Sequence, residues 1–312
     1  LMEDELALRL VAYRHDNAGY IDLISTPDIE AVAAANGATV QLENDYNDHT
    51  YTGVRANLLW QANDKLSMSL LFATQKLDQD GDPISSTLLD SYTYAKTVSP
   101  TFREDQIDVA NLVIEYDLDW ATLFSSSSHF DGENPSALDS SRAGAPVNFG
   151  PATFAINLEK QGFVQEVRLS SKRDGNLQFI IGGYYEDFEG ADTRHLFWHG
   201  SQAALVAAGL GTNSTYFFSQ REQTLTQKAL FGEITYAFNP QWELTLGTRW
   251  FDYDREDKEL PGAYFGPFPP GLGSSLSTDE KGTTSKINIG YSPSDEVKLY
   301  AQWSEGFRLG LG

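Results

Sequence analysis

Residues 227–256 form two alternating runs joined by a short break. They read QKALFGEITYAFNPQWELTLGTRWFDYDRE, and alternation with a period of two is typical of a β-strand whose two faces meet different surroundings. The break at Asn239-Pro240 predicts a hairpin turn, because proline cannot donate to a β-ladder. The second run is about twelve residues or more, whereas strands of soluble sheets have roughly five or six and bilayer-crossing strands ~9–11. This length, with aromatic residues at both ends of the apolar side, favours a strand of a membrane β-barrel.

The same alternation recurs along the whole chain and predicts about 11 long strands. The connections between them alternate between very short and very long ones, as in outer-membrane barrels, which have tight periplasmic turns and long extracellular loops. The predicted fold class is therefore all-β, an antiparallel transmembrane β-barrel. Within the first long connection, AVAAANGA is compatible with a short helix or a loop. The long connections are predicted at 21–47, 78–101, 132–157, 191–221 and 257–278.

Alternate side chains of such strands face lipid, and the side chains between them face a polar lumen. The predicted lipid-facing residues include Val54, Leu58, Leu70, Ile114, Leu246 and Ile289. The predicted periplasmic aromatic girdle is Trp60, Trp120, Trp242, Phe238 and Tyr291, and the outer one is Trp250, Tyr185 and Phe188. The alternative for these apolar residues is a core between two stacked sheets of a soluble protein.

Charged residues of the opposite parity are predicted to line the lumen. Their expected role is a solvated ion-pair network along the inner wall, with direct ligand contact as the alternative. They are Arg9, Arg55, Glu166, Arg168, Glu233, Glu243 and Arg249.

The composition excludes several classes of function. The 312-residue chain has no Cys, which leaves no disulfide framework and no thiolate metal site. Its 44 acidic and 22 basic residues give a formal net charge of −22, so nucleic acid is not an expected partner, because phosphate binding needs the opposite sign. The negative mean hydropathy does not exclude a membrane barrel, because only alternate residues of its strands meet lipid.

The sequence predicts no catalytic constellation, cofactor or metal site, and hence no enzyme. His195 and His199 could share a metal ion only if their segment were helical, and the glutamate of a zinc-protease motif is missing. Ligand contact is expected instead from residues of the long connections, because loops on a rigid scaffold carry binding and aromatic side chains act as anchors. The candidates are His195, Phe197, Trp198, His199, Tyr216, Phe217, Tyr264 and Phe265.

Five segments together resemble the barrel domain of TonB-dependent outer-membrane receptors of the siderophore type. They are EDELALRLVAYRHDNAGYIDL, GVRANLLWQANDKLSMSLLF, FVQEVRLSSKRDGNLQFIIGGYYED, LFGEITYAFNPQWELTLGTRWFDYDRE and YSPSDEVKLYAQWSEGFRLG. The resemblance implies a 22-stranded barrel filled by an N-terminal plug, of which this chain would hold about half. Residues 1–312 are therefore expected to form one partial barrel domain, with the plug and the C-terminal strands outside it.

The resemblance also implies a function, a location and partners. The expected function is uptake of a scarce nutrient, a ferric siderophore or other iron complex first, across the Gram-negative outer membrane. The implied partners are the TonB complex, acting through the plug, together with outer-membrane lipid and lipopolysaccharide. The alternatives are a passive porin-like or adhesin barrel and a soluble all-β binding protein.

Overall fold

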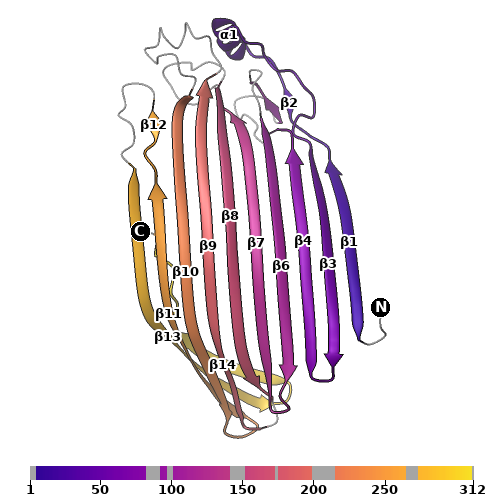
Figure 1. Cartoon of the computed structure of the whole chain (residues 1–312), viewed down its shortest axis with the longest axis vertical. Coiled ribbons are helices and arrows are strands. Elements are labelled where there is room, and N and C mark those ends of the chain that lie inside the picture. Colours follow the sequence, from indigo (N-terminus) through magenta and orange to yellow (C-terminus); the bar gives the residue numbers. More distant parts are fainter. Residues whose placement is uncertain are drawn as a thin grey trace.

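The computed structural model describes residues 5–81, 92–96, 101–140, 152–172, 175–198, 215–264 and 273–310. Eleven long strands form one antiparallel sheet in which each strand pairs with its neighbours in chain order (Figure 1). They are β1 (Leu6–Asn17), β3 (His49–Asn63), β4 (Leu66–Gln79), β6 (Phe102–Asp117), β7 (Ala121–Asp139), β8 (Ala152–Ser171), β9 (Leu177–Trp198), β10 (Thr215–Ala237), β11 (Trp242–Glu259), β13 (Ser274–Ser294) and β14 (Val297–Ser304).

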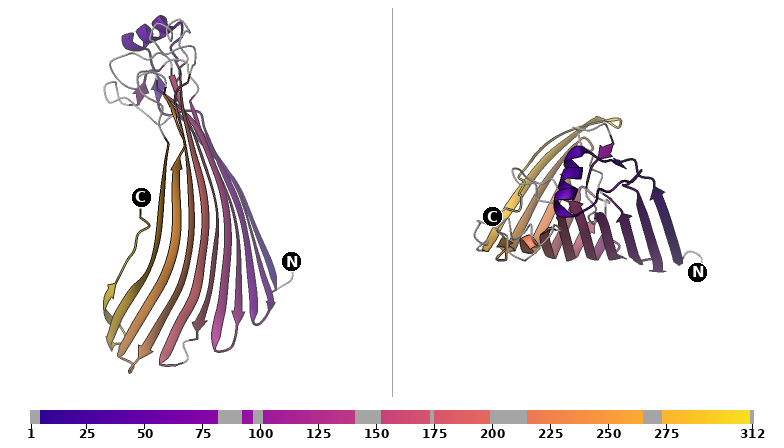
Figure 2. Two further views of the ribbon diagram at one scale, coloured as in Figure 1. Left: turned by 60° about the vertical axis from the view of Figure 1, so that its left-hand side comes forward. Right: turned by 90° about the horizontal axis from the view of Figure 1, so that it is seen from above.

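The sheet is a single curved layer whose edge strands are β1 and β14, and the sheet is not closed (Figure 2). The short turns all lie at one end of it, and we call this the short-turn end. The predicted number of long strands, their antiparallel order and the absence of a second stacked sheet among the described residues are thus confirmed.

The strands are longer than the sequence predicts. Two predicted connections, 132–157 and 191–221, are wrong at both ends, because β7 continues to Asp139, β8 begins at Ala152, β9 continues to Trp198 and β10 begins at Thr215. The extensions mix polar and apolar side chains, and the apolar ones lie on both faces, with Phe154 on the charged face and Phe197 on the apolar face. The alternation that marks a strand in the sequence therefore stops while the backbone ladder continues. β9 has 22 residues, about twice what a tilted strand needs to cross a bilayer. In a bilayer, about half of such a strand would therefore project beyond the hydrocarbon.

The two faces of the sheet differ in character. Residues directly opposite each other on paired strands share a face, so the register assigns every strand residue to one face. One face carries a row of leucines on four neighbouring strands, each directly opposite the next: Leu8, Leu58, Leu70 and Leu112. We call this the apolar face. The residues between them, with Val11 opposite Arg55 and Arg55 opposite Ala73, define the charged face.

Large apolar side chains are exposed along the apolar face. Leu70 is 47% exposed, Leu246 49% and Ile289 42%, and none of the six predicted lipid-facing residues is buried. The buried side chains of β10 and β11 belong to the charged face and include Leu225, Ala229, Phe251 and Tyr253. The described residues therefore exclude the alternative, a core between two stacked sheets, and agree with the predicted exposed apolar face.

Aromatic residues mark the short-turn end of the apolar face. Trp242 stacks on Tyr291 with ring centroids 4.4 Å apart, and Trp120 lies 6.3 Å from Phe179. At the other border, Trp250 and Tyr185 lie on the apolar face as predicted. Phe188 does not. It is opposite Leu225 and packs against the buried cluster of the charged face, because it is an odd number of residues from Tyr185.

The charged face contains a repeated pairing of glycine with an aromatic ring from the neighbouring strand. A Cβ atom on Gly53 would lie 2.4 Å from Tyr13, on Gly162 2.5 Å from Phe130, on Gly182 2.5 Å from Phe231 and on Gly282 2.7 Å from Phe251. In all four pairs the two residues are directly opposite each other. Rings that occupy the space above glycine save space on one face only, which favours bending of the sheet toward that face.

The connections opposite the short-turn end contain a small packed unit. β2 (Asp22–Leu23) pairs in parallel with β5 (Thr93–Tyr94), and Ile21, Leu23 and Tyr46 are buried together beside it. The helix left open by the sequence is formed as α1 (Pro27–Asn36), capped by Thr26 and ended by Gly37 in the left-handed conformation. No helix in the described ranges is long and apolar enough to cross a membrane.

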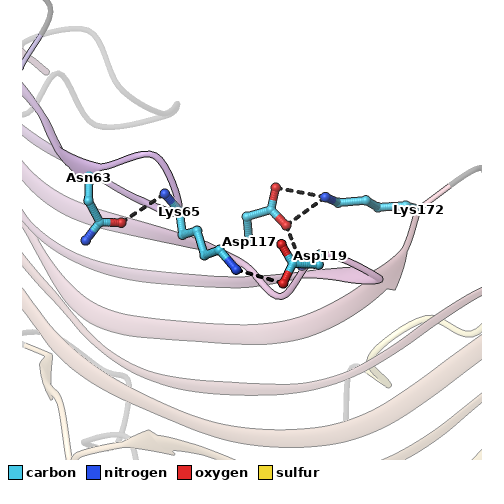
Figure 3. A network of polar contacts seen from close by, with 5 residues as sticks. All are labelled: Asn63, Lys65, Asp117, Asp119 and Lys172. Atoms are coloured by element: carbon cyan, nitrogen blue, oxygen red, sulfur yellow. Dashed lines mark hydrogen bonds and ion pairs between the residues drawn. The ribbon is translucent and has the colours of Figure 1, made fainter.

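Polar contacts join successive turns at the short-turn end (Figure 3). Lys65 Nζ donates to Asp119 Oδ2 at 2.7 Å, which links the β3–β4 turn to the β6–β7 turn. Lys172 Nζ donates to Asp117 Oδ2 at 2.9 Å and continues the chain of contacts to the end of β8. These pairs fix the spacing of three consecutive hairpins.

Candidate functional site

The seven charged residues predicted to line the lumen all lie on the charged face. The register of paired strands places each of them on this face, from Arg9, opposite Asn57 in β3, to Glu243, opposite Gly290 in β13. Arg168, Gly182, Phe231 and Arg249 follow one another as directly opposite residues across β8 to β11. The register therefore brings the predicted set onto one wall.

Most of these side chains have a partner on the same wall. Arg168 Nη1 lies 3.3 Å from Glu166 Oε1, and its guanidinium lies 4.2 Å from the ring centre of Phe124. Arg249 lies 5.3 Å from the ring centre of Tyr184. Cation–π contacts of this kind hold a guanidinium in place without neutralising it.

Two lysines that the sequence reading did not single out complete this wall. Lys286 Nζ lies 2.7 Å from Glu233 Oε2, and Lys298 Nζ lies 2.6 Å from Glu243 Oε1. The register places both lysines on the same face of the sheet as these glutamates. Their alternation with apolar residues along the strand is the sequence signal that could have identified them as residues of the charged face.

Further from the short turns, the charged face has a hollow of about 550 Å³ between β8 and β13. Its lining combines apolar side chains with paired charges: Leu158, Phe188 and Leu276 alternate with Asp192, Arg221 and Asp257. Arg221 Nη2 lies 3.7 Å from Glu259 Oε1, and Arg255 Nε lies 2.6 Å from Asp257 Oδ2. Such a surface suits non-covalent binding of a ligand with both polar and apolar groups.

The predicted ligand-contact residues that the structure describes lie in strands rather than loops, and those with described side chains are divided between the two faces. His195 is directly opposite Phe218, and its ring stacks on that of Phe197 with the ring centroids 5.2 Å apart. It is an even number of residues from Tyr185 in β9, so it lies on the apolar face. Phe217 lies opposite Leu196, on the charged face, 6.3 Å from Phe154. The predicted set is therefore not one cluster.

The remaining members of that set are only partly described. Trp198, Tyr216 and Tyr264 belong by their backbone to β9, β10 and β12 (Ala263–Tyr264). His199 and Phe265 lie outside the described residues. His195 is in a strand, so the helical spacing that a metal site with His199 would need is not formed there. Within the described ranges, no group of three or more His, Asp or Glu side chains is placed to hold a metal ion.

A one-layer antiparallel sheet with an exposed apolar face, a charged face and aromatic residues at the short-turn border is the wall of a transmembrane β-barrel. The family model for the TonB-dependent receptor-like β-barrel matches residues 13–311. The chain belongs to the TonB-dependent receptor β-barrel family.

Solved structures with the same fold include iron-chelate receptors. The ferric yersiniabactin uptake receptor FyuA from Yersinia pestis aligns with 97% of this chain at 13% identity and a TM-score of 0.73. The siderophore receptor PiuA from Acinetobacter baumannii aligns with 97% at 14% identity and a TM-score of 0.63. The ferric-catecholate import receptor Fiu from E. coli aligns with 97% at 13% identity and a TM-score of 0.63.

The chain spans less than half the length of these three receptors, namely 42% of FyuA, 45% of PiuA and 47% of Fiu. At these identities the likeness shows the fold alone. Among proteins with curated descriptions, none matches the sequence of this chain.

Proposed function

We propose that residues 1–312 are a partial barrel domain of an outer-membrane TonB-dependent receptor that takes up a scarce nutrient, and that the nutrient is a ferric siderophore or another iron complex. The observation that carries this proposal is the family match over residues 13–311 of a wall with one lipid-compatible face and one charged face. The similar structures bind ferric yersiniabactin, siderophores and ferric catecholates according to their names, which favours an iron chelate as cargo.

The mechanism involves binding and conformational change without covalent chemistry. The cargo enters from the end opposite the short turns and meets the hollow on the charged face. The ion-paired residues nearer the short turns, such as Glu233 with Lys286, contact a plug domain supplied by the rest of the receptor. The TonB complex then acts on that plug from the periplasm and releases the cargo.

The same proposal places the chain in the outer membrane of a Gram-negative bacterium. Its short turns face the periplasm and its long strand extensions face the outside, following the asymmetry of known barrels. Membrane lipid covers the apolar face, and lipopolysaccharide surrounds the outer strand extensions.

Growth of a deletion strain on a panel of iron sources tests the cargo. We expect the strain to lose growth on one ferric siderophore and to keep growth on ferrous salts. Growth equal to the wild type on every iron source would refute the iron assignment.

A passive porin-like barrel is separated by the energy requirement of uptake. Uptake of labelled ferric siderophore should stop when TonB is deleted or the proton-motive force is dissipated. Uptake that continues in both cases would show a passive channel.

A further inference from the structure

A hollow of about 400 Å³ lies on the apolar face between β8 and β11. Seven of the nine residues that line it have the parity of the apolar face, among them Val167, Gly183, Leu230 and Trp250. The hollow therefore opens toward lipid in the proposed orientation, on the opposite side of the sheet from the candidate cargo site.

Gly183 creates this hollow. A Cβ atom at this position would meet Leu230 Cδ2 at 3.5 Å and Ala229 O at 3.8 Å, which are ordinary contact distances, and its φ angle is not in the left-handed region. Neither strain nor a close approach of backbone therefore requires glycine here. Its effect is to leave an empty space between Val167, Leu230 and Trp250.

A polar cluster borders the hollow but offers little to a protein partner. Gln165 Nε2 donates to Ser125 Oγ at 3.0 Å and to Glu166 O at 3.1 Å, and Ser127 Oγ donates to Gln165 Oε1. Both donor hydrogens of the amide and one site of its oxygen are thus occupied within the wall. Such a cluster can face hydrocarbon without a second chain to satisfy it.

The other end of the hollow carries a cation. Lys228 lines it beside Tyr185, and among the described residues no carboxylate forms an ion pair with Lys228. Asp252, directly opposite, is 2.9 Å from Lys281 Nζ instead. Asp187 accepts from Tyr185 and from Thr226, each at 3.3 Å. Both of these carboxylates are therefore engaged with other side chains, and the ammonium of Lys228 is available.

The depth of Lys228 suits a lipid headgroup. About ten residues of β10 separate it from the Phe238 end of the strand, which at ~3.4 Å per residue and a tilt of roughly 40° spans about 25 Å, the height of the apolar band of such barrels. Lys228 therefore lies at the outer border of the hydrocarbon, with the hollow directly below it.

We propose that this hollow binds one acyl chain of a phosphorylated outer-leaflet lipid such as lipid A, whose phosphate is held by Lys228. The inference rests on the proposed outer-membrane placement. The shape of the hollow supplies most of its selectivity for an acyl chain. Inside the membrane an acyl chain does not leave water when it binds, so its gain comes from the dispersion contacts it makes on filling the hollow. The charge-assisted contact with Lys228 favours a phosphate over an uncharged headgroup.

Native mass spectrometry of the receptor purified from the outer membrane tests this proposal. The probes are diphosphorylated lipid A and its dephosphorylated counterpart. Gly183→Leu fills the hollow, and Gly232→Leu is the matched control, because Gly232 also faces lipid, has only Ile180 O at 3.7 Å from its Cβ position and does not line the hollow. Lys228→Gln removes the cation. All variants are first compared for recovery in the outer-membrane fraction.

We expect Gly183→Leu to weaken binding of both lipids on the order of tenfold and Gly232→Leu to bind as the wild type does. Lys228→Gln should bind the phosphorylated lipid only as well as the dephosphorylated one. Equal binding by the two glycine variants would overturn the proposal, and so would an unchanged phosphate preference in Lys228→Gln. Recovery of the wild-type receptor in buffer without detergent would instead refute the membrane placement.

Discussion

Phe217 and Phe197 come from paired strands but lie on opposite faces of the sheet, so they discriminate between two routes for a ligand. Phe217 is on the charged face with the hollow, whereas Phe197 stacks on His195 on the other face. We expect Phe217→Ala to weaken binding of the ferric siderophore about tenfold, because a buried aromatic anchor contributes roughly 1–2 kcal/mol. Phe197→Ala should stay within about twofold. Titration calorimetry of the purified receptor measures both, and a reversed order would place the ligand outside the lumen.

Lys65 and Asp119 connect two turns at the short-turn end, outside the hydrocarbon. The hydrogen bond to Asp119 raises the pKa of Lys65 above its usual 10.5. A raised pKa in the folded state means that the ion pair stabilises the fold at neutral pH and that this contribution disappears as the pH rises through the raised pKa. Unfolding in denaturant should therefore become easier above about pH 10 in the wild type.

Asp119→Asn is the control for that measurement. Asp119 has φ 68°, and asparagine tolerates this left-handed conformation while it removes the charge. The variant should lose the part of the pH dependence that comes from Lys65. If the wild type and the variant weaken in parallel as the pH rises, the ion pair contributes nothing measurable.

At the scale of strands, the pairing of Gly182 with Phe231 provides a sharp test of the packing on the charged face. A Cβ at Gly182 would lie 2.5 Å from Phe231 Cζ and 2.8 Å from Val167 O. Because the backbone of β8 cannot move away cheaply, Gly182→Val should lower the free energy of unfolding by about 1–3 kcal/mol. Gly232→Val, next to Phe231 but on the open apolar face, should cost much less. Urea unfolding in lipid vesicles compares the two, and equal losses would contradict the assigned faces.

The alternation in the sequence predicts strand number, order and faces, but it does not predict where strands end. Arg55, Glu166 and Glu233 lie on the predicted face because parity is fixed by the backbone alone. Alternation does not predict the extensions of β7 to β10, because the backbone hydrogen bonds of the ladder continue where the apolar side chains no longer keep to one face. For this reason the sequence predicts a loop at His195 and Phe217, and their separation onto two faces follows from the register rather than from composition.

At the scale of the whole molecule, one proposition supports the family's function: the apolar face meets lipid and the charged face meets water. Leu70 and Leu59 test it as a matched pair. They are 47% and 48% exposed, lie on neighbouring strands, and face opposite sides, since Leu70 is opposite Leu58 and Leu59 is opposite Ser69. Their similar exposure and similar distance from the β3–β4 turn leave the surrounding solvent as the main difference between them.

Arginine at each position should therefore have unequal effects. Leu70→Arg puts a charge into hydrocarbon and should lower the free energy of unfolding in phospholipid vesicles by about 2–4 kcal/mol. Leu59→Arg puts the same charge into the aqueous lumen beside other polar side chains, and its cost should be a small fraction of that. Equal costs would mean that both faces meet the same solvent. A larger cost for Leu59→Arg would mean that the charged face, not the apolar face, meets lipid. Either result would remove the physical basis for a transport route along the charged face.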